Sequence, residues 1–390
     1  MPRHPLVSTT SQALSDRVYS ALADRARRMP GPVFPLHVGD TWLQPPDAAR
    51  DEARDCAHRA RTWSYSPIQG EPVLLDAIRG RLRERHGVEL DPECLQVMPG
   101  ATTGLAVAVA ALLEPGDELL LPSPFWPLIR GIARGRGCRA VEVPFFTRLG
   151  EAGFDPERAL EEQVTPRTAA IYLNTPHNPT GRVLADDVVA SIARVARRHD
   201  LWVISDEAYE DLAYGAPPRP PWRRADLADR TVAVHTLSKS FALAGARVGY
   251  AHGPREAMQA VRGVQAFDSY CAARPMQLAA ARALTGGGEW LAEARRLYAE
   301  AGRSAAAAAG IPAPEAGTFL FLDVSRSLRP GEGLDGFLER CLSAGVLVTP
   351  GPACGRHFST WIRLCFTAVA PDELRQALER LAAVLRPPDG

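Results

Sequence analysis

Lysine is almost absent from this chain. Among its 45 lysine and arginine residues only Lys239 is a lysine, and the other 44 are arginines. Arginine can replace lysine in most ion pairs, but its guanidinium stays protonated and cannot form an imine with an aldehyde, whereas a buried amine can lose its proton. We therefore expect that Lys239 is kept for chemistry. The alternative, a surface lysine that survives by chance, has to be decided by its neighbours.

Three further absences exclude whole classes of protein. The formal net charge is zero, which argues against a nucleic acid or an acidic membrane as partner. The seven cysteines are scattered and never spaced as C-x-x-C, so neither a zinc site nor a disulfide framework is indicated. The longest apolar run, residues 105–113, is too short to span a bilayer, and the first residues contain no apolar signal core. The sequence predicts a soluble cytoplasmic protein with no metal.

What the chain does contain is a series of short apolar stretches that alternate with helical patterns such as residues 103–113 and 184–199. The stretches lack the alternation of a half-exposed strand, which is typical of parallel strands covered on both faces. They lie at residues 118–121, 169–173, 201–205, 232–236 and 248–251. This order predicts an α/β fold with a mostly parallel sheet flanked by helices.

From about Gly286 the composition changes to long stretches rich in alanine, arginine and leucine. These helical stretches surround strand candidates at residues 319–323, 346–349 and 361–366. We expect a large domain at residues 45–285 and a smaller α+β domain formed by residues 1–44 together with 286–390.

Hydroxyl groups and a cation surround the single lysine. Thr236 and Ser238 precede Lys239, and Arg247 follows eight residues later. Such groups can hold a phosphate while the amine reaches a nearby carbonyl. Here the chain resembles the fold-type I pyridoxal-phosphate (PLP) enzymes, specifically the class I/II aminotransferases, whose S-x-S-K pattern is followed by an arginine at this spacing. The resemblance implies that Lys239 forms an imine with PLP and that Thr236, which keeps the hydroxyl of the more usual serine, Ser238 and Arg247 bind its phosphate.

A short glycine-rich turn, Gly100-Ala101-Thr102, opens a predicted helix. Small residues let the backbone approach a ligand, and the free N–H groups at the helix start favour an anion. The resemblance assigns Gly100, Ala101 and Thr102 to the PLP phosphate. It also assigns Tyr65, in a Y-x-P-x-x-G segment, to the same phosphate across a dimer interface. It therefore implies a homodimer with shared active sites, whose monomer would be inactive.

Three motifs would surround the cofactor ring. Asn178 stands in the string N-x-P-x-N-P-T-G, and the resemblance implies that it donates to the phenolic oxygen and that its bond to Pro179 is cis. Asp206 ends an apolar stretch, where a carboxylate is costly unless it is paired. By resemblance its partner is the pyridinium nitrogen, which keeps the ring an electron acceptor. Tyr209 would share the phenolic oxygen with Asn178, and Trp126 would stack on the ring.

The substrate contacts follow from the resemblance as well. Gly39 and Arg363 lie in segments that look like the family's two carboxylate-binding elements, so that Arg363 would hold the α-carboxylate bidentately. Trp42 adds apolar bulk near the expected substrate mouth. An acidic substrate side chain would need a second cation, but Thr102 stands where some acidic-substrate members have lysine. We expect a neutral, hydrophobic or aromatic amino donor.

Arginine is so abundant that one of three others could still supply the second cation. The candidates are Arg130, Arg274 and Arg356. An arginine that reaches the substrate side chain from any of these positions would change the expected substrate class.

The predicted activity is PLP-dependent transfer of an amino group from an L-amino acid to a 2-oxo acid, with Lys239, Asp206 and Tyr209 as catalytic residues. In this reading the Lys239 amine moves the proton between Cα and the cofactor. The same cofactor shell also serves elimination, cyclisation and oxidation of amino acids, and the sequence leaves these open. A non-catalytic PLP-binding sensor is a remote alternative, because roughly 35 residues before Leu36 are too few for a winged helix-turn-helix module.

Overall fold

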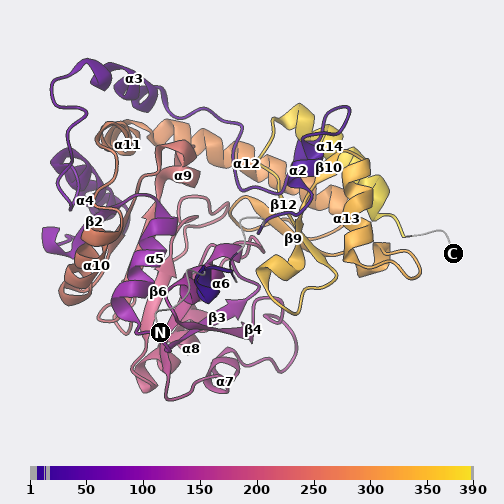
Figure 1. The fold of residues 1–390 in the computed structure, drawn as a ribbon, viewed down its shortest axis with the longest axis horizontal. Coiled ribbons are helices and arrows are strands. Elements are labelled where there is room, and N and C mark those ends of the chain that lie inside the picture. Colours follow the sequence, from indigo (N-terminus) through magenta and orange to yellow (C-terminus); the bar gives the residue numbers. More distant parts are fainter. Residues whose placement is uncertain (1–6, 13, 15–17, 388–390) are drawn as a thin grey trace.

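A seven-stranded sheet forms the centre of the computed structural model, which describes residues 7–12, 14 and 18–387 (Figure 1). The strand order is β2-β8-β7-β6-β5-β3-β4. The strands span Leu95–Met98 (β2), Glu118–Ser123 (β3), Arg139–Pro144 (β4), Thr168–Asn174 (β5), Trp202–Asp206 (β6), Thr231–Thr236 (β7) and Gly249–His252 (β8). Neighbours from β7 to β4 are parallel. The predicted α/β fold is confirmed, and β2 and β4 are strands that the sequence did not indicate.

The strand predicted at residues 248–251 forms as β8, but the prediction that it runs parallel to its neighbours is wrong. β8 runs antiparallel to both of its neighbours, β7 and β2. A strand buried on both faces reads as one apolar run whichever way it points, so hydropathy does not determine its direction. Between β7 and β8 the chain forms only the short helix α9 (Leu237–Ser240) and the 3₁₀ turn η4 (Ala244–Ala246). No crossover helix of the kind that connects parallel strands lies between β7 and β8.

Helices cover both faces of the sheet. Because alternate residues of a strand point to opposite sides, neighbouring residues of one strand pack against different helices. Tyr172 and Ile204 pack in one core with α5, α6 and α10, whereas Ile171 and Val203 pack in another with α7 and α8. These helices span Ala101–Leu112 (α5), Pro127–Gly135 (α6), Pro156–Glu161 (α7), Asp186–Arg198 (α8) and Arg255–Asp268 (α10). The helices predicted at residues 103–113 and 184–199 therefore form, with ends shifted by one or two residues.

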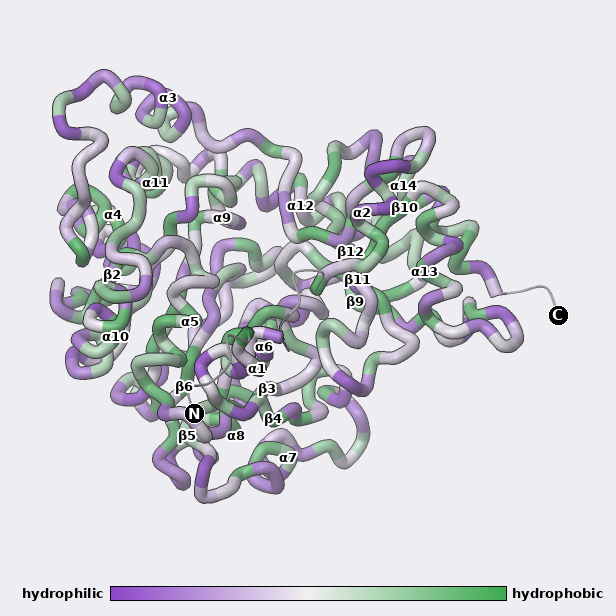
Figure 2. Tube along the Cα trace, viewed as in Figure 1, coloured by the Kyte–Doolittle hydropathy of each residue, from purple (hydrophilic) through white to green (hydrophobic). Residues whose placement is uncertain are grey.

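A third core lies around β2 and β8. The helices that form it are α3 (Asp47–Asp55), α4 (Pro72–His86) and α11 (Arg274–Gly286). Figure 2 shows the contrast between a buried and a peripheral helix, since α5 is coloured as hydrophobic and α3 as hydrophilic.

A second group of elements lies beside this sheet, to the right in Figure 1. β9 (Phe319–Asp323), β12 (Trp361–Cys365) and β11 (Thr349–Pro350) form an antiparallel sheet, and β1 (Phe34–Pro35) pairs in parallel with β10 (Val346–Leu347). The helices α12 (Gly288–Ala309), α13 (Leu334–Ser343) and α14 (Pro371–Leu385) surround these strands. Phe34 and Leu36 share their buried core, so the N-terminal segment joins the C-terminal third.

The strand predicted at residues 346–349 is divided between β10 and β11, which belong to different sheets. The expected domain limits, 45–285 and 1–44 plus 286–390, stay a prediction.

Short elements complete the chain. They are the helices α1 (Thr9–Gln12) and α2 (Ala23–Ala26) and the 3₁₀ turns η1 (Cys56–His58), η2 (Pro92–Cys94), η3 (Pro221–Arg223), η5 (Ser325–Ser327) and η6 (Gly351–Cys354). Over the described ranges, no helix has both the length and the apolar character that a bilayer span requires.

Candidate active site

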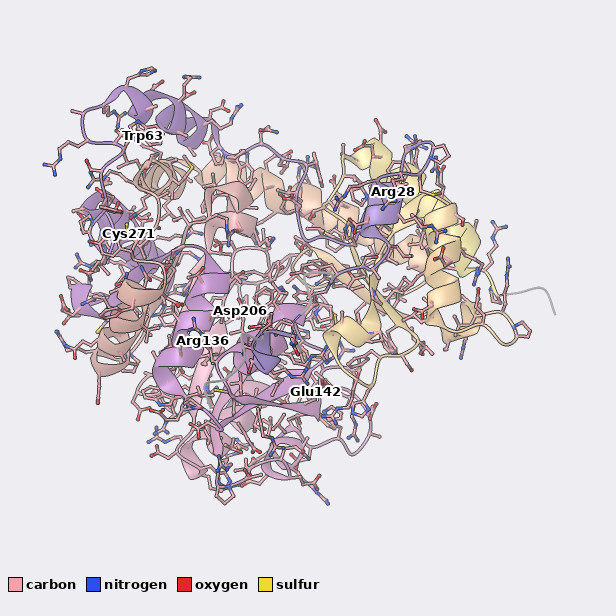
Figure 3. The ribbon with its side chains drawn as sticks, in the orientation of Figure 1. Arg28, Trp63, Arg136, Glu142, Asp206 and Cys271 are labelled. Carbon is pink, nitrogen blue, oxygen red and sulfur yellow. The ribbon has the colours of Figure 1, made fainter. Side chains whose placement is uncertain are left out.

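One cavity of about 170 Å³ collects most of the residues that the sequence singled out. It lies where β6 and β7 end and where α5 and α6 begin, which is the carboxyl edge at which open α/β sheets bind ligands. The predicted site residues among its lining are Gly39, Ala101, Thr102, Trp126, Asn178, Asp206, Tyr209, Thr236, Ser238, Lys239, Arg247 and Arg363. Figure 3 places Asp206 near the middle of the molecule.

The amine of Lys239 lies in this cavity. The residue belongs to α9, whose N-terminus is capped by Thr236, because the Thr236 hydroxyl accepts a hydrogen bond from the Ser238 N–H at 3.2 Å. The amine donates to the Gly39 carbonyl at 2.5 Å, across to the N-terminal segment. Burial lowers the pKa of Lys239; Cys365 and Asp40 oppose this effect, while Arg363 and Arg247 add to it. The surroundings thus favour a neutral, nucleophilic amine.

Hydroxyls, a cation and a helix start also line the cavity. Thr236 donates to the Ser238 hydroxyl at 2.9 Å, and the guanidinium of Arg247 lies beside the first turn of α5. Gly100 precedes that helix with φ +82°, and a side chain there would collide with Arg247. Only glycine at this position allows the guanidinium of Arg247 to lie next to the N-terminus of α5. This combination suits a phosphate.

A buried carboxyl also lines the cavity. Asp206 is the last residue of β6, and burial raises its pKa to about 6 despite two hydrogen bonds that it accepts. Tyr172 donates to its Oδ2 at 2.7 Å, and the backbone N–H of Ala208 donates to its Oδ1 at 3.1 Å. A carboxyl this deeply buried is favourable only with a hydrogen-bonded or charged partner.

Asn178 and Tyr209 come together from different segments. The Asn178 side-chain amide donates to the Tyr209 hydroxyl at 3.4 Å, and burial raises the pKa of Tyr209. The Asn178 backbone N–H donates to the side chain of Asn174, the last residue of β5, at 2.8 Å. The bond between Asn178 and Pro179 is cis, as predicted.

Arg363 is almost completely enclosed, with 1% of its surface exposed. From β12 it donates to the Asn178 side-chain oxygen at 3.1 Å and to the His37 carbonyl at 3.0 Å. Its guanidinium lies over the Phe319 ring, 4.2 Å from the centroid. Its Nε atom has no hydrogen-bond partner among the described residues. A buried cation with an unpaired donor that lines a cavity suits an anionic ligand.

Comparison with known proteins decides the family. A model of the class I and II aminotransferases matches residues 32–381. The chain belongs to this family. It is 34% identical over 383 residues to an aspartate/prephenate aminotransferase of Thermus thermophilus, with 94% of each chain covered. It is 29% identical over 392 residues to aromatic-amino-acid aminotransferase 2 of Thermococcus litoralis, covering 96% of this chain and 98% of that protein.

The fold of this aminotransferase also matches solved structures. A tetra mutant of the Thermus thermophilus aspartate aminotransferase in complex with tryptophan superimposes with a TM-score of 0.89 at 31% identity, covering 98% of this chain and 100% of the other. The chain is thus a PLP-dependent aminotransferase, which transfers amino groups between amino acids and 2-oxo acids.

The residues of this aminotransferase fit PLP at each of its reactive parts. The group formed by Arg247, Thr236, Ser238 and the start of α5 suits the phosphate, and the Lys239 amine suits the aldehyde. The buried Asp206 carboxyl suits a protonated ring nitrogen, because a cationic partner offsets the cost of desolvating its charged form.

Three residues predicted for the site of this aminotransferase do not line the cavity. Gly100 lies behind Arg247, where its lack of a side chain matters. Trp42 packs edge-on against Tyr298, with ring centroids 5.5 Å apart. Tyr65 is 80% exposed and packs edge-on against Tyr270 at 5.2 Å.

The sequence missed several residues of the cavity wall. Tyr19, Val38, Leu128 and Phe319 line it, and the Arg363 guanidinium lies 5.3 Å from the Tyr19 ring centroid. Tyr172, which holds Asp206, was missed because it belongs to an apolar strand. A polar hydroxyl in that otherwise aliphatic run, two residues before Asn174, was the available signal.

Proposed function

We propose that this aminotransferase takes its amino group from a neutral, hydrophobic or aromatic L-amino acid, and that its active site is shared between two copies of the chain. The observation that carries the proposal is the position of the Lys239 amine, which lines a cavity whose other cationic groups among the described residues are Arg247 and Arg363. A phosphate would take up the first arginine, and a substrate α-carboxylate would take up the second.

When bound, PLP supplies an aldehyde that takes up the amino group and a ring that accepts the electrons of the broken Cα–H bond. In our proposal Lys239 takes the proton from Cα, because burial lowers the pKa of its amine and so favours the neutral, basic form. Arg363 holds the carboxylate through its free Nε, which fixes Cα within reach of that amine. Asp206 keeps a proton on the ring nitrogen. Asn178 and Tyr209 form hydrogen bonds with the phenolic oxygen.

The remaining groups of the cavity favour a neutral substrate side chain. Its wall includes Tyr19, Val38, Leu128 and Phe319, and no further cation among the described residues faces it. The three arginines that could have entered are engaged elsewhere. Arg130 and Arg356 both bind the buried Glu142, whose Oε1 lies 3.1 Å from Arg130 Nη1, and Arg274 binds Glu71 at 2.7 Å.

A second copy of the chain would cover the exposed aromatic residue Tyr65. The segment around it is held firmly, because Arg274 donates to the Arg61 carbonyl at 2.9 Å and Gln277 donates to the Ser66 hydroxyl at 3.0 Å. Tyr65 therefore projects outward from a fixed loop. In the proposed dimer it reaches the phosphate of the partner's site. The seven free cysteines suit the cytoplasmic location that the proposal includes.

A single half-reaction tests the proposal. The PLP-loaded enzyme is mixed with phenylalanine and no oxo acid, and we expect one equivalent of the matching 2-oxo acid per site without ammonia or peroxide. Ammonia or peroxide release would contradict the proposed outcome. Sedimentation of wild type and Tyr65→Ala tests the dimer: a fully active monomer would contradict the shared site.

A further inference from the structure

The Asp206 carboxyl has one side-chain donor among the described residues, and that donor is Tyr172. Tyr172 lies on β5, next to β6, where Asn174 pairs with Asp206. Because side chains two residues apart point to the same face of a strand, Tyr172 lies on the face of Asp206 and reaches its Oδ2 at 2.7 Å. Only 2% of its surface is exposed, and it packs in the apolar core beneath α5.

The other contacts of Asp206 are with the backbone. Oδ1 accepts the Ala208 N–H at 3.1 Å, and the Asp206 carbonyl accepts the Asn174 side-chain amide at 2.8 Å. Neither contact depends on Tyr172. The hydroxyl therefore holds one carboxyl oxygen, while the carboxyl still lines the cavity.

We propose that Tyr172 is a positioning residue for the cofactor ring: its hydroxyl donates to Asp206, aims the carboxyl into the cavity and keeps the shared proton on the ring nitrogen. The proposal rests on the role proposed above for Asp206. A donor to a carboxylate stabilises its charged form, so the carboxyl becomes a weaker base. The proton between carboxyl and ring nitrogen then stays with the nitrogen, where it serves as an electron-withdrawing charge.

The electrostatic surroundings agree with this geometry. Burial raises the pKa of Asp206, and the Tyr172 bond is the largest of the effects that oppose it, ahead of the Ala208 N–H, His235 on β7 and Lys239 on α9. Burial and the nearby carboxylate raise the pKa of Tyr172 well above its usual range, so the hydroxyl keeps its proton. Tyr209 faces the same pair from the loop after β6.

The test is Tyr172→Phe, which removes the hydroxyl and keeps the ring. The ring nitrogen of ¹⁵N-labelled PLP on the variant should show a chemical shift moved toward that of an unprotonated pyridine. Deuterium exchange at Cα should fall about 10- to 100-fold, the range expected for a lost hydrogen bond to a charged group. KM for the amino donor should change by less than about threefold, since Arg363 is untouched.

The matched control is Tyr250→Phe. Tyr250 is equally buried, and its hydroxyl donates to the Glu210 carboxylate at 3.5 Å, outside the cavity. A general effect of losing a buried hydroxyl would appear in both variants. If Tyr172→Phe leaves the ¹⁵N shift and the exchange rate as they are in Tyr250→Phe, the proposal is overturned.

Asp206→Asn separates this inference from the proposed function. If Tyr172 acts through the carboxyl, Tyr172→Phe adds little to the loss of exchange already caused by Asp206→Asn. Full additivity of the two changes would overturn the role of Tyr172 alone. An Asp206→Asn enzyme with a normal ¹⁵N shift and normal exchange would overturn the role of Asp206, and with it the proposed function of this end of the site.

Discussion

The cavity has two halves that are built in different ways. The half that we propose binds the cofactor consists of Asp206, Thr236, Lys239 and Arg247, together with the start of α5, and all of it belongs to the large sheet and its connections. The half that we propose binds the substrate consists of Tyr19, Val38, Gly39, Phe319 and Arg363, which come from the two ends of the chain. The first half is positioned by neighbouring strands, and the second by packing between distant segments. This difference predicts that changes in the first half abolish chemistry and that changes in the second half alter affinity and choice of substrate.

Lys239→Arg gives the largest expected effect. Arginine keeps the positive charge but cannot form the imine or act as a base, so turnover should fall by many orders of magnitude, since general-base catalysis alone contributes roughly 10²–10⁴-fold. Steady-state kinetics measures the loss, and circular dichroism checks that the fold is kept. Turnover at an ordinary rate would contradict the mechanism.

Asp206→Ala tests the proposed role of the buried carboxyl. We expect the covalent attachment of PLP to persist while deuterium exchange at Cα falls by at least about 100-fold, because an unprotonated ring is a poor electron acceptor. Exchange that stays within about threefold of wild type, under 1 kcal/mol of barrier, would show that Asp206 has another role.

Arg363→Lys probes the substrate half. The lysine keeps a charge but loses the planar fork that meets the carboxylate, so KM for the amino donor should rise about 10- to 100-fold while PLP affinity stays within about twofold. Arg375→Lys is the control, since Arg375 lies exposed on α14 in an ion pair with Glu379. A loss of PLP affinity as large as the change in KM would remove the distinction between the halves.

A smaller change is expected when kcat/KM is compared between amino acids. The apolar wall around Val38, Leu128 and Phe319 should favour phenylalanine and leucine over aspartate by about tenfold or more in kcat/KM, because a carboxylate side chain would be buried without a partner. A tenfold preference for aspartate would show that an arginine, such as Arg130 or Arg356, leaves Glu142 when substrate binds.

A further expected effect concerns the stability of the PLP-free protein, not its activity. Burial raises the pKa of Asp206 from 3.8 to about 6, so the folded state binds this proton more tightly than the unfolded state. Binding of this proton contributes roughly 3 kcal/mol to the free energy of unfolding below pH 3.8, and this contribution is lost as the pH rises through about 6. Asp206→Asn should therefore gain stability relative to wild type between pH 4 and 7 in denaturant titrations. A difference that does not change with pH would contradict the assigned burial.

The sequence singled out more of the cavity wall in the proposed cofactor half than in the proposed substrate half, for a physical reason. Lys239, Asp206 and Asn178 lie in contiguous strings at the ends of apolar stretches, and parallel strands bring such ends to one edge. Tyr19 and Phe319 have no motif of their own, since their position depends on how distant segments pack. The bulk of Trp42 predicts a place near the substrate, whereas in the structure its ring packs against Tyr298.

The direction of β8 could not be read for a similar reason. Its burial on both faces gives the same apolar pattern in either direction, and the chain reversal after Lys239 depends on α9 and η4. β2 and β4 were missed because Gln96 lies within the first and Arg139 and Glu142 within the second, where the sequence shows no continuous apolar run.

The most direct measurement is reduction of the PLP-loaded enzyme with borohydride, followed by mass spectrometry of its peptides. The structure positions the Lys239 amine in the cavity with a lowered pKa, and no other lysine exists in the chain. We expect one equivalent of cofactor fixed to residue 239 in wild type and none in Lys239→Arg. Cofactor that stays unattached after reduction, or that is fixed elsewhere while turnover is normal, would contradict the account.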